Sequence, residues 1–201
     1  MDKGAAEYVT KKHVDMVKQI GGCIEQVAGP EAARKVISGS EKLSKATPEE
    51  TALWMKGAID RLDKTVDKTK RTQIMELCGR NCAQVNKGLV ERYRKKRVKF
   101  ESLDNFIVAE EKNPQKGTRI ERAGNVVYHY YTPESYGQGL RCFCALFRGL
   151  PKKERASLTY CNCSKAFVET VWQAIVGKPV KVDLIESSIS GAKECKFAVH
   201  L

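Results

Sequence analysis

The sequence predicts an α+β protein, with a helical N-terminal half packed on a C-terminal antiparallel sheet with helices. Two observations predict this class. In the first hundred residues, apolar residues recur every three to five positions, which is the spacing of one face of an α-helix. After segment 110–117, β-branched and aromatic residues form short runs bounded by glycine, proline and asparagine, as in strands and turns. We therefore expect a helical region at 1–112 and an α+β domain at 113–201.

Capping residues mark the helices of the first half. Gly29 can end a first helix and Pro30 can open the next, because proline suits the first helical position. In "ATPEET", Thr47 is a natural N-cap, Pro48 follows it, and Glu50 falls three residues after the cap. This arrangement predicts a capping box at the start of a helix.

Two more helices are expected before the sheet. The apolar face that includes Ile74 and Leu89 predicts one helix from about Asp67 through the basic run that ends near residue 97. A shorter helix over "SLDNFIVAEEK" would begin at Ser102 or Asp104, since both residue types are good N-caps.

The second half should supply the sheet. Glycine and asparagine tolerate the positive φ of a tight hairpin, so "AGN" indicates a turn between two strands. The expected elements are this hairpin around 123–125, a strand over 140–147, a short helix opening at Pro151, an amphipathic helix over 164–177, and a closing strand pair at 178–188 and 195–201.

Composition limits the classes of function. With 201 residues and 42% hydrophobic residues, the chain can bury a core. Its first twenty residues carry scattered charges instead of the apolar stretch of a signal peptide, and no run approaches the roughly 18 apolar residues of a membrane span. Neither a P-loop nor a three-glycine dinucleotide motif is present, which disfavours nucleotide hydrolysis. We expect a soluble, cytoplasmic protein with no membrane partner.

The charge is strongly positive and unevenly spread. Lys and Arg number 36 against 24 Asp and Glu, a net charge of +12. Cations at a helix end interact well with the helix dipole, so a basic run is typical of a solvated helix terminus. A phosphate or nucleic-acid contact is the weaker alternative. The run at 91–100 contains Arg92, Arg94, Lys95, Lys96, Arg97 and Lys99.

Eight cysteines are the most distinctive feature of the chain. A reducing compartment argues against a disulfide framework. Cys-x-Cys pairs in a strand would hold their Cα atoms about 6.5 Å apart with parallel side chains, which also disfavours bridging. Two roles remain for the cysteines. They are either small hydrophobic residues buried in the core or residues that take part in metal or redox chemistry.

Three cysteine pairs could act as ligand arms. Cys78 and Cys82 share a helix face, and the two Cys-x-Cys pairs would each point one way if extended. Four thiolates satisfy tetrahedral zinc, and an iron–sulfur cluster is the alternative cofactor. The candidate metal ligands are Cys78, Cys82, Cys142, Cys144, Cys161 and Cys163.

A cysteine nucleophile would need a base beside it. His129 alternates with tyrosines in a predicted strand, Tyr160 adjoins Cys161, and Glu186 lies near the end of a predicted strand. These three are the candidate ligand-binding or acid–base residues. A cysteine-dependent hydrolase or redox enzyme acting on a small molecule is therefore the alternative function, and whether the protein is an enzyme stays open.

The last forty residues resemble the end of the 4-vinyl reductase domain, a small-molecule-binding α+β module. The matching pattern is a cysteine opening a helix, Gly-x-x-Val before a strand that carries glutamate, and Gly-x-x-x-Cys-x-Phe at the end. The whole chain also resembles an uncharacterised cysteine-rich bacterial family and, more distantly, the thiazoline carboxylate hydrolase group. The matching positions are Cys161 or Cys163, Gly177 to Val180, Glu186, Gly191, Cys195 and Phe197.

The resemblance implies ligand binding and, in some members, zinc held by the first cysteine, the glutamate and two later cysteines. This chain departs from that set, because Ser187, Ser188 and Ser190 stand where a further cysteine would be wanted. Cys142, Cys144 or the helical pair would have to fill the vacant place. We therefore expect a small-molecule- or metal-binding protein with a cysteine-lined site between its two halves, and a homodimer is left open.

Overall fold

The computed structural model describes residues 3–137 and 139–201, with side chains from His13 onward. Its architecture is α+β, as the sequence predicts. The α-helices of the described part are α1 (Lys3–Ala28), α2 (Pro30–Val36), α3 (Pro48–Thr65), α4 (Lys68–Val85), α5 (Lys87–Arg97), α6 (Leu103–Lys112) and α7 (Asn162–Val176).

One antiparallel sheet has the strand order β1-β2-β4-β3. Strands β1 and β2 form the expected hairpin, in which Gly124 takes a φ of 60° that a residue with a side chain rarely adopts. The closing strands pair with each other, and β4 also pairs with β2. The strands are β1 (Thr118–Ala123), β2 (Val126–Tyr131), β3 (Lys181–Glu186) and β4 (Cys195–His200).

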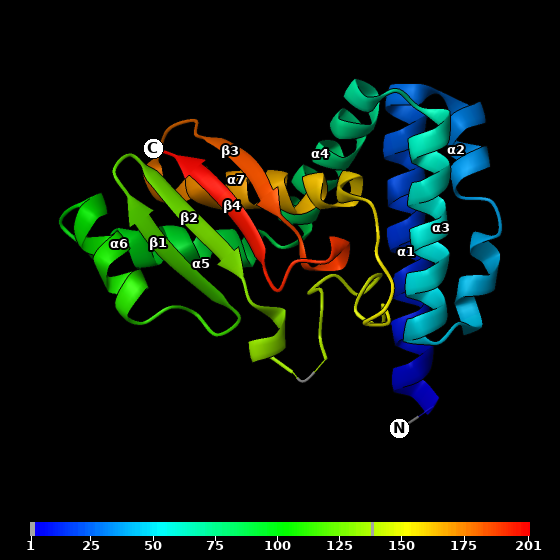
Figure 1. Ribbon diagram of the computed structural model, residues 1–201, viewed down its shortest axis with the longest axis horizontal. Coiled ribbons are helices and arrows are strands. Elements are labelled where there is room, and N and C mark those ends of the chain that lie inside the picture. The colour runs from blue at the N-terminus through cyan, green and yellow to red at the C-terminus, as the bar shows by residue number, and fades with distance from the viewer. Residues whose placement is uncertain (1–2, 138) are drawn as a thin grey trace.

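The helices form two groups around α4. In Figure 1, α1, α2 and α3 stand together on one side, while α5 and α7 lie behind the sheet on the other. Helix α4 joins the groups because it packs on both α1 and α7. The junction between the two halves of the chain is therefore built mainly from α4 and the start of α7.

Several predicted helix boundaries are confirmed. Pro30 opens α2, and Ser102 caps α6 by accepting a hydrogen bond from the Asn105 amide at 3.0 Å. The capping box of α3 is complete, since the Glu50 amide donates to Thr47 Oγ1 at 3.2 Å and the Thr47 amide donates to Glu50 Oε2 at 2.7 Å. The side chain of Val9, expected on the apolar face of the first helix, lies outside the described side chains.

The single helix expected from about 67 to 97 is wrong, because the chain forms two helices that meet at Asn86. This residue leaves helical geometry (φ −101°, ψ 27°), and its side-chain amide donates to the Cys82 carbonyl at 2.8 Å. The Asn86 backbone amide donates to the same carbonyl at 3.0 Å, so Asn86 closes the end of α4 with two hydrogen bonds.

The strand expected over 140–147 and the helix expected at Pro151 are also wrong. This segment is irregular, and a 3₁₀ turn at Leu158–Cys161 precedes α7. Its backbone is held by Arg141, whose guanidinium donates to the carbonyls of Pro151 at 2.7 Å and Ser188 at 2.6 Å. Side-chain bonds of this kind replace a sheet ladder and satisfy the buried carbonyls.

Two hydrophobic clusters form the core. The first joins the α1–α4 helices to the irregular segment, where Leu146 and Phe147 are fully buried. The second lies between the sheet, α6 and α7, with Trp172 and Phe197 at its centre. Because α6 belongs to the second cluster, the two clusters do not divide the chain at residue 112. The expected division into 1–112 and 113–201 stays a prediction.

Candidate functional site

The eight cysteines, which all lie in the described part of the chain, come from six parts of the fold, and none of them forms a disulfide bond. Helix α1 supplies one, α4 supplies two, the irregular segment two, the 3₁₀ turn before α7 one, α7 one and β4 one. In that order they are Cys23, Cys78, Cys82, Cys142, Cys144, Cys161, Cys163 and Cys195.

A close crossing of α4 and α7 brings many of them together. Gly79 of α4 lies directly against the start of α7, where an added Cβ would clash with the Cys163 carbonyl and come within 2.8 Å of Ala166 Cβ. Only glycine permits backbones to approach this closely. The cysteines that flank Gly79 in α4 are thereby set beside those at the start of α7.

Cys163 is the centre of a four-thiol cluster, which we define as Cys82, Cys144, Cys161 and Cys163. The pKa of Cys163 is raised well above its ordinary value, first by burial and then by negative charge on Cys144, Cys82, Cys161 and, last, Cys23. A charge acts this strongly only over short distances in a weakly screened interior. The structure therefore gathers thiols from three separate segments at one place.

Hydroxyl groups accompany two of these thiols. Tyr160 Oη lies 3.0 Å from Cys144 Sγ, and Ser187 Oγ lies 2.9 Å from Cys161 Sγ. Burial is the main reason that the pKa of Cys161 rises to about 12 and that the pKa of Tyr160 lies well above its ordinary value. At neutral pH these groups are uncharged.

Cys142 and Cys195 flank the four-thiol cluster. Burial, followed by charge on Cys144 and Cys161, raises the pKa of Cys142 well above its ordinary value. The Ser188 amide and hydroxyl each lie 3.5 Å from Cys195 Sγ. Ser187 and Ser188, two of the three serines that break the expected cysteine pattern, are thus close neighbours of sulfur atoms.

Cys78 contacts Cys23 of α1 and also lies near enough to Cys163 for charge on that thiol to raise the pKa of Cys78. Its thiol donates a hydrogen bond to the sulfur of Cys23, a residue that the sequence did not single out. The sequence places Cys78 and Cys82 on one helix, and both lie in α4. It does not predict the contact between Cys78 and Cys23, because that contact depends on the packing of α1 on α4.

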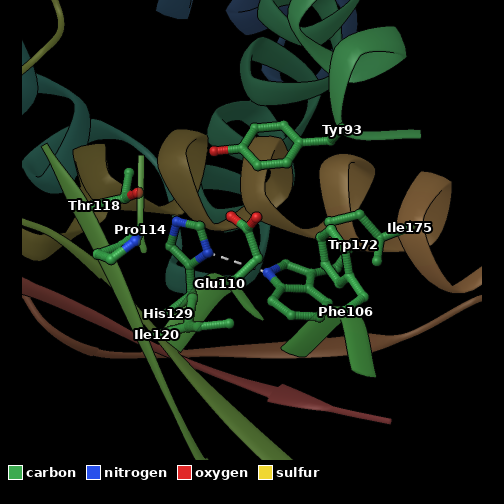
Figure 2. Close-up of a pocket in the computed structure, with 9 residues that line it drawn as sticks. All are labelled: Tyr93, Phe106, Glu110, Pro114, Thr118, Ile120, His129, Trp172 and Ile175. Carbon is green, nitrogen blue, oxygen red and sulfur yellow. Dashed lines mark hydrogen bonds between the residues drawn. The ribbon is translucent and has the colours of Figure 1, made fainter. Parts of the chain in front are cut away.

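His129 lies in a separate cavity between the sheet and α7 (Figure 2). The indole N–H of Trp172 donates to His129 Nδ1 at 3.1 Å, so the neutral ring carries its proton on Nε2. That second nitrogen is buried and has no hydrogen-bond partner among the described residues. Burial lowers the pKa of His129 to about 4, which keeps the ring neutral.

The cavity beside His129 is small. Its volume is about 10 Å³, which is room for about one water molecule. Tyr93 and Glu110 add polar groups to its lining, and the carboxylate of Glu110 pairs with Lys96. No sequence pattern indicates Trp172, Tyr93 or Glu110 as site residues, since their meeting depends on packing between α5, α6 and α7.

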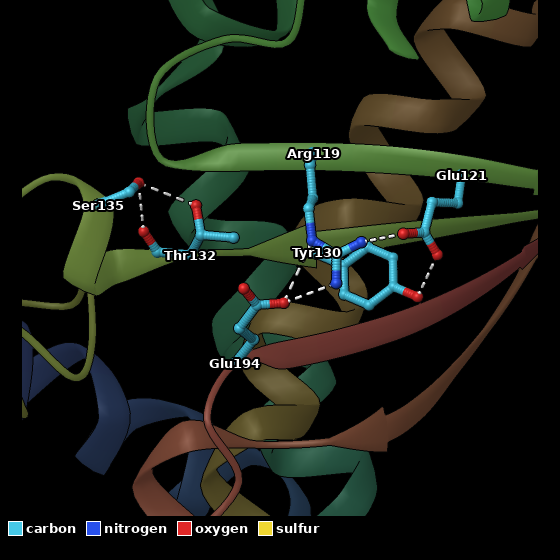
Figure 3. A network of polar contacts seen from close by, with 6 residues as sticks. All are labelled: Arg119, Glu121, Tyr130, Thr132, Ser135 and Glu194. Carbon is cyan, nitrogen blue, oxygen red and sulfur yellow. Dashed lines mark hydrogen bonds and ion pairs between the residues drawn. The ribbon is translucent and has the colours of Figure 1, made fainter.

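Glu186 is exposed on the opposite face of the sheet, so the three predicted ligand-binding residues do not meet. It lines a shallow groove of about 360 Å³ with Arg119 and Tyr130. Figure 3 shows the neighbouring network, in which Arg119 donates to Glu194 Oε2 at 2.7 Å and the Tyr130 hydroxyl donates to Glu121 at 2.7 Å. These charges are largely satisfied by one another.

The basic run lies along α5, which buries none of its side chains. Arg94 pairs with Glu91 at 3.0 Å, and Arg97 donates to the Phe100 carbonyl at 2.9 Å. Local partners of this kind fit a solvated helix end, and nucleic-acid binding stays a prediction.

No helix in the described part of the chain is long and apolar enough to cross a membrane. Within that part, no group of three or more histidine, cysteine, aspartate or glutamate side chains is arranged to hold a metal ion. A metal would therefore require thiol side chains of the cluster to rotate toward one another.

The fold and its thiols define an α+β protein with a cysteine-rich junction between two hydrophobic clusters. The chain belongs to DUF6144, a family of unknown function whose profile matches residues 11–201. This agrees with the whole-chain resemblance to an uncharacterised family, whereas the resemblance to the 4-vinyl reductase domain stays a prediction.

No curated protein matches the chain. Among solved structures, it is similar to the Fe(II) unliganded H-NOX protein from K. algicida, with 11% identity and a TM-score of 0.48. The match covers 93% of this chain and 95% of the other. At that identity and TM-score, the likeness implies no shared activity or cofactor.

Proposed function

We propose that the protein binds a soft metal ion, zinc in the first instance, through Cys82, Cys144, Cys161 and Cys163. The observation that carries this proposal is that charge on Cys144, Cys82 and Cys161 raises the pKa of Cys163, and charge on Cys144 also raises the pKa of Cys161, so these thiols lie near one another. Four cysteine ligands are the usual number for a structural zinc site. An iron–sulfur cluster, which also uses four thiolates, is the alternative occupant.

The electrostatics of the cluster support a cation there. In the metal-free protein, burial keeps Cys144, Cys161 and Cys163 protonated, and charge on neighbouring thiols adds to this effect at Cys161 and Cys163. A divalent cation reverses that balance, because its charge stabilises several thiolates at once while their protons leave to solvent. When bound, zinc would fix the crossing of α4 and α7.

Hydroxyl groups would then act as a second layer around the metal ligands. The Tyr160 and Ser187 hydroxyls already touch Cys144 at 3.0 Å and Cys161 at 2.9 Å. Once those sulfurs are thiolates, both hydroxyls can donate hydrogen bonds to them, which orients ligands in known metal sites. Cys144 lies on the irregular segment, where a rotation of the chain breaks no sheet ladder.

A cysteine enzyme centred on Cys144 and Tyr160 has less support. The two groups are in contact, but burial raises the pKa of both. A nucleophilic thiol needs a lowered pKa or a base that accepts its proton. Tyr160 supplies neither at neutral pH.

The proposal is tested by elemental analysis of protein purified without air, without a metal-binding tag. We expect about one zinc per chain, consistent with a four-thiolate site. Cys163→Ser should lower the zinc content at least tenfold. Cys195→Ser is the matched control, because Cys195 is also a buried thiol beside a serine yet lies outside the ligand set, and it should keep its zinc.

The outcomes are distinct. Iron and sulfide in place of zinc, with a visible absorption band, would support the iron–sulfur alternative. Less than a tenth of an equivalent of any transition metal in folded wild-type protein, even after incubation with zinc, would overturn metal binding at this cluster. Equal loss of zinc in both serine variants would overturn the ligand assignment.

A further inference from the structure

Cys23 and Cys78 form a pair of buried thiols between α1 and α4, outside the proposed metal ligands. Cys23 is 3% exposed and Cys78 is 8% exposed. The Cys78 thiol donates a hydrogen bond to the Cys23 sulfur, so the two sulfur atoms are direct neighbours. The pair joins helices that are far apart in the sequence.

Three groups support a negative charge on Cys23. Cys78 donates through its thiol, the Asn81 side-chain amide donates at 3.5 Å, and Arg80 contributes its positive charge. Together they outweigh burial and lower the pKa of Cys23 to about 7, with the hydrogen bond from Cys78 as the largest cause. Cys78, the donor in this pair, has its pKa raised beyond the ordinary range.

The pair lies close to the protein surface. Asn81 and Gly22, which lie next to Cys23, are both exposed. An added Cβ at Gly22 would meet no atom within 4 Å, so the surface of α1 is open there. Hydrogen peroxide would therefore reach the Cys23 sulfur beside the Asn81 side chain, which contacts that sulfur at 3.5 Å.

We propose that Cys23 and Cys78 are an oxidation site at which hydrogen peroxide forms a reversible disulfide between α1 and α4. A nucleophilic thiolate beside a protonated partner thiol is the arrangement in which such a bond forms readily. The site differs from the four-thiol cluster in chemistry, since it takes an oxidant instead of a cation.

The reaction balances in two steps. The Cys23 thiolate attacks one peroxide oxygen, the O–O bond breaks, and the released hydroxide takes a proton to become water, which leaves a sulfenic acid on Cys23. The Cys78 thiol then attacks that sulfur, the S–S bond forms, and the hydroxyl leaves with the thiol proton as a second water. Two thiols lose two electrons and one peroxide becomes two waters.

The test is peptide mapping after treatment with one equivalent of hydrogen peroxide and alkylation of the remaining thiols. We expect a Cys23–Cys78 linked peptide as the first oxidation product. Its rate should rise about tenfold between pH 6 and pH 8, following the thiolate fraction of Cys23. In Cys78→Ser, oxidation should stop at a sulfenic acid on Cys23, which dimedone traps.

Two asparagine variants provide a matched comparison that keeps every cysteine. Asn81→Ala removes a donor to Cys23 and should slow oxidation severalfold at pH 7. Asn86→Ala is the control, since the Asn86 amide makes the same 3.5 Å contact with a different thiol, that of Cys82. It should leave the rate of the Cys23–Cys78 bond unchanged.

Metal content and oxidation are scored separately, on zinc-loaded and chelator-treated protein. A first disulfide between other cysteines, or oxidation of other thiols while Cys23 and Cys78 stay reduced, would overturn the proposal in either sample. A rate of Cys23–Cys78 disulfide formation that does not change between pH 6 and pH 8 would overturn the role of the Cys23 thiolate. Equal rates in Asn81→Ala and wild type would do the same. None of these results bears on whether zinc binds.

Discussion

The protonation state of a buried sulfur or nitrogen in this protein depends on burial and on the groups that donate hydrogen bonds to it. Cys23 and Cys161 are both buried, yet the pKa of Cys23 falls to about 7 while that of Cys161 rises to about 12. The difference follows from their partners, because Cys23 accepts bonds from a thiol and an amide beside a positive charge, whereas burial dominates at Cys161. Identical side chains therefore take different chemical roles.

His129 provides a prediction at the residue scale. Its pKa is about 4 in the fold against an ordinary 6.5, so the folded state favours the neutral ring. A histidine with a lowered pKa contributes stability above pH 6.5 that is lost as the pH falls toward 4. We expect wild type to lose about 3 kcal/mol more free energy of unfolding than His129→Gln between pH 7 and pH 4.

Urea unfolding at several pH values measures this difference. His200→Gln keeps His129 and should keep the His129 part of the loss in acid, apart from the smaller change that follows from removing the His200–Asp183 pair. If the free energy of unfolding fell by the same amount with pH in wild type and His129→Gln, the result would contradict the burial of a neutral imidazole against Trp172.

At the scale of elements, the crossing of α4 over α7 organises the site. Gly79 allows the helix backbones to meet, and the cysteines on both sides follow from that contact. A helix-interior glycine costs about 1 kcal/mol relative to alanine, so its presence here needs a packing reason. The clash that any larger residue would make with Cys163 supplies that reason.

The matched pair Gly79→Ala and Gly88→Ala tests the crossing. An added Cβ at Gly79 meets the α7 backbone, and we expect a loss of about 1–3 kcal/mol in the free energy of unfolding from overpacking. An added Cβ at Gly88 in α5 meets no atom within 4 Å, so that variant should gain up to about 1 kcal/mol from helix propensity. Equal stabilisation of both variants in urea titrations would rule out the close approach.

At the scale of the whole molecule, the thiol-rich junction links two hydrophobic clusters. Its acidic groups, among them the Cys142 thiol and the Tyr160 hydroxyl, lie where the α1–α4 helices meet the sheet domain, and burial raises their pKa values. Acids whose pKa is raised by folding hold their protons above pH 9, where the unfolded chain has lost them. Their stabilising effect is complete below pH 9 and falls as the pH rises toward the folded-state pKa.

Alkaline titration of the metal-free protein tests this view. Cys161, with a pKa raised from 9.0 to about 12, should alone remove about 2 kcal/mol of unfolding free energy between pH 9 and pH 10.5. Cys163→Ser should show a shallower decline than wild type, because one buried acid is gone. A stability that stays flat over this range, measured by urea unfolding with reductant present, would contradict a buried thiol cluster.

The local elements could be predicted from the sequence because their causes lie within a few residues. The cap at Thr47, the stop at Gly29 and the turn at Gly124 each depend on the backbone preferences of neighbouring residues. The irregular segment after residue 139 could not be predicted in this way. Its apolar run fits a strand, but Arg141 holds it by contacts with residues up to 47 positions away.

The sequence by itself determined the α+β class, most helix ends, the hairpin and the presence of three cysteine pairs. Only the tertiary structure decided which thiols meet. Cys23 joins Cys78 because α1 packs on α4, and Cys163 becomes the centre of the cluster because Gly79 lets α7 approach. Periodicity and capping are short-range properties of the chain, whereas the neighbours of a sulfur atom are set by how separate helices cross.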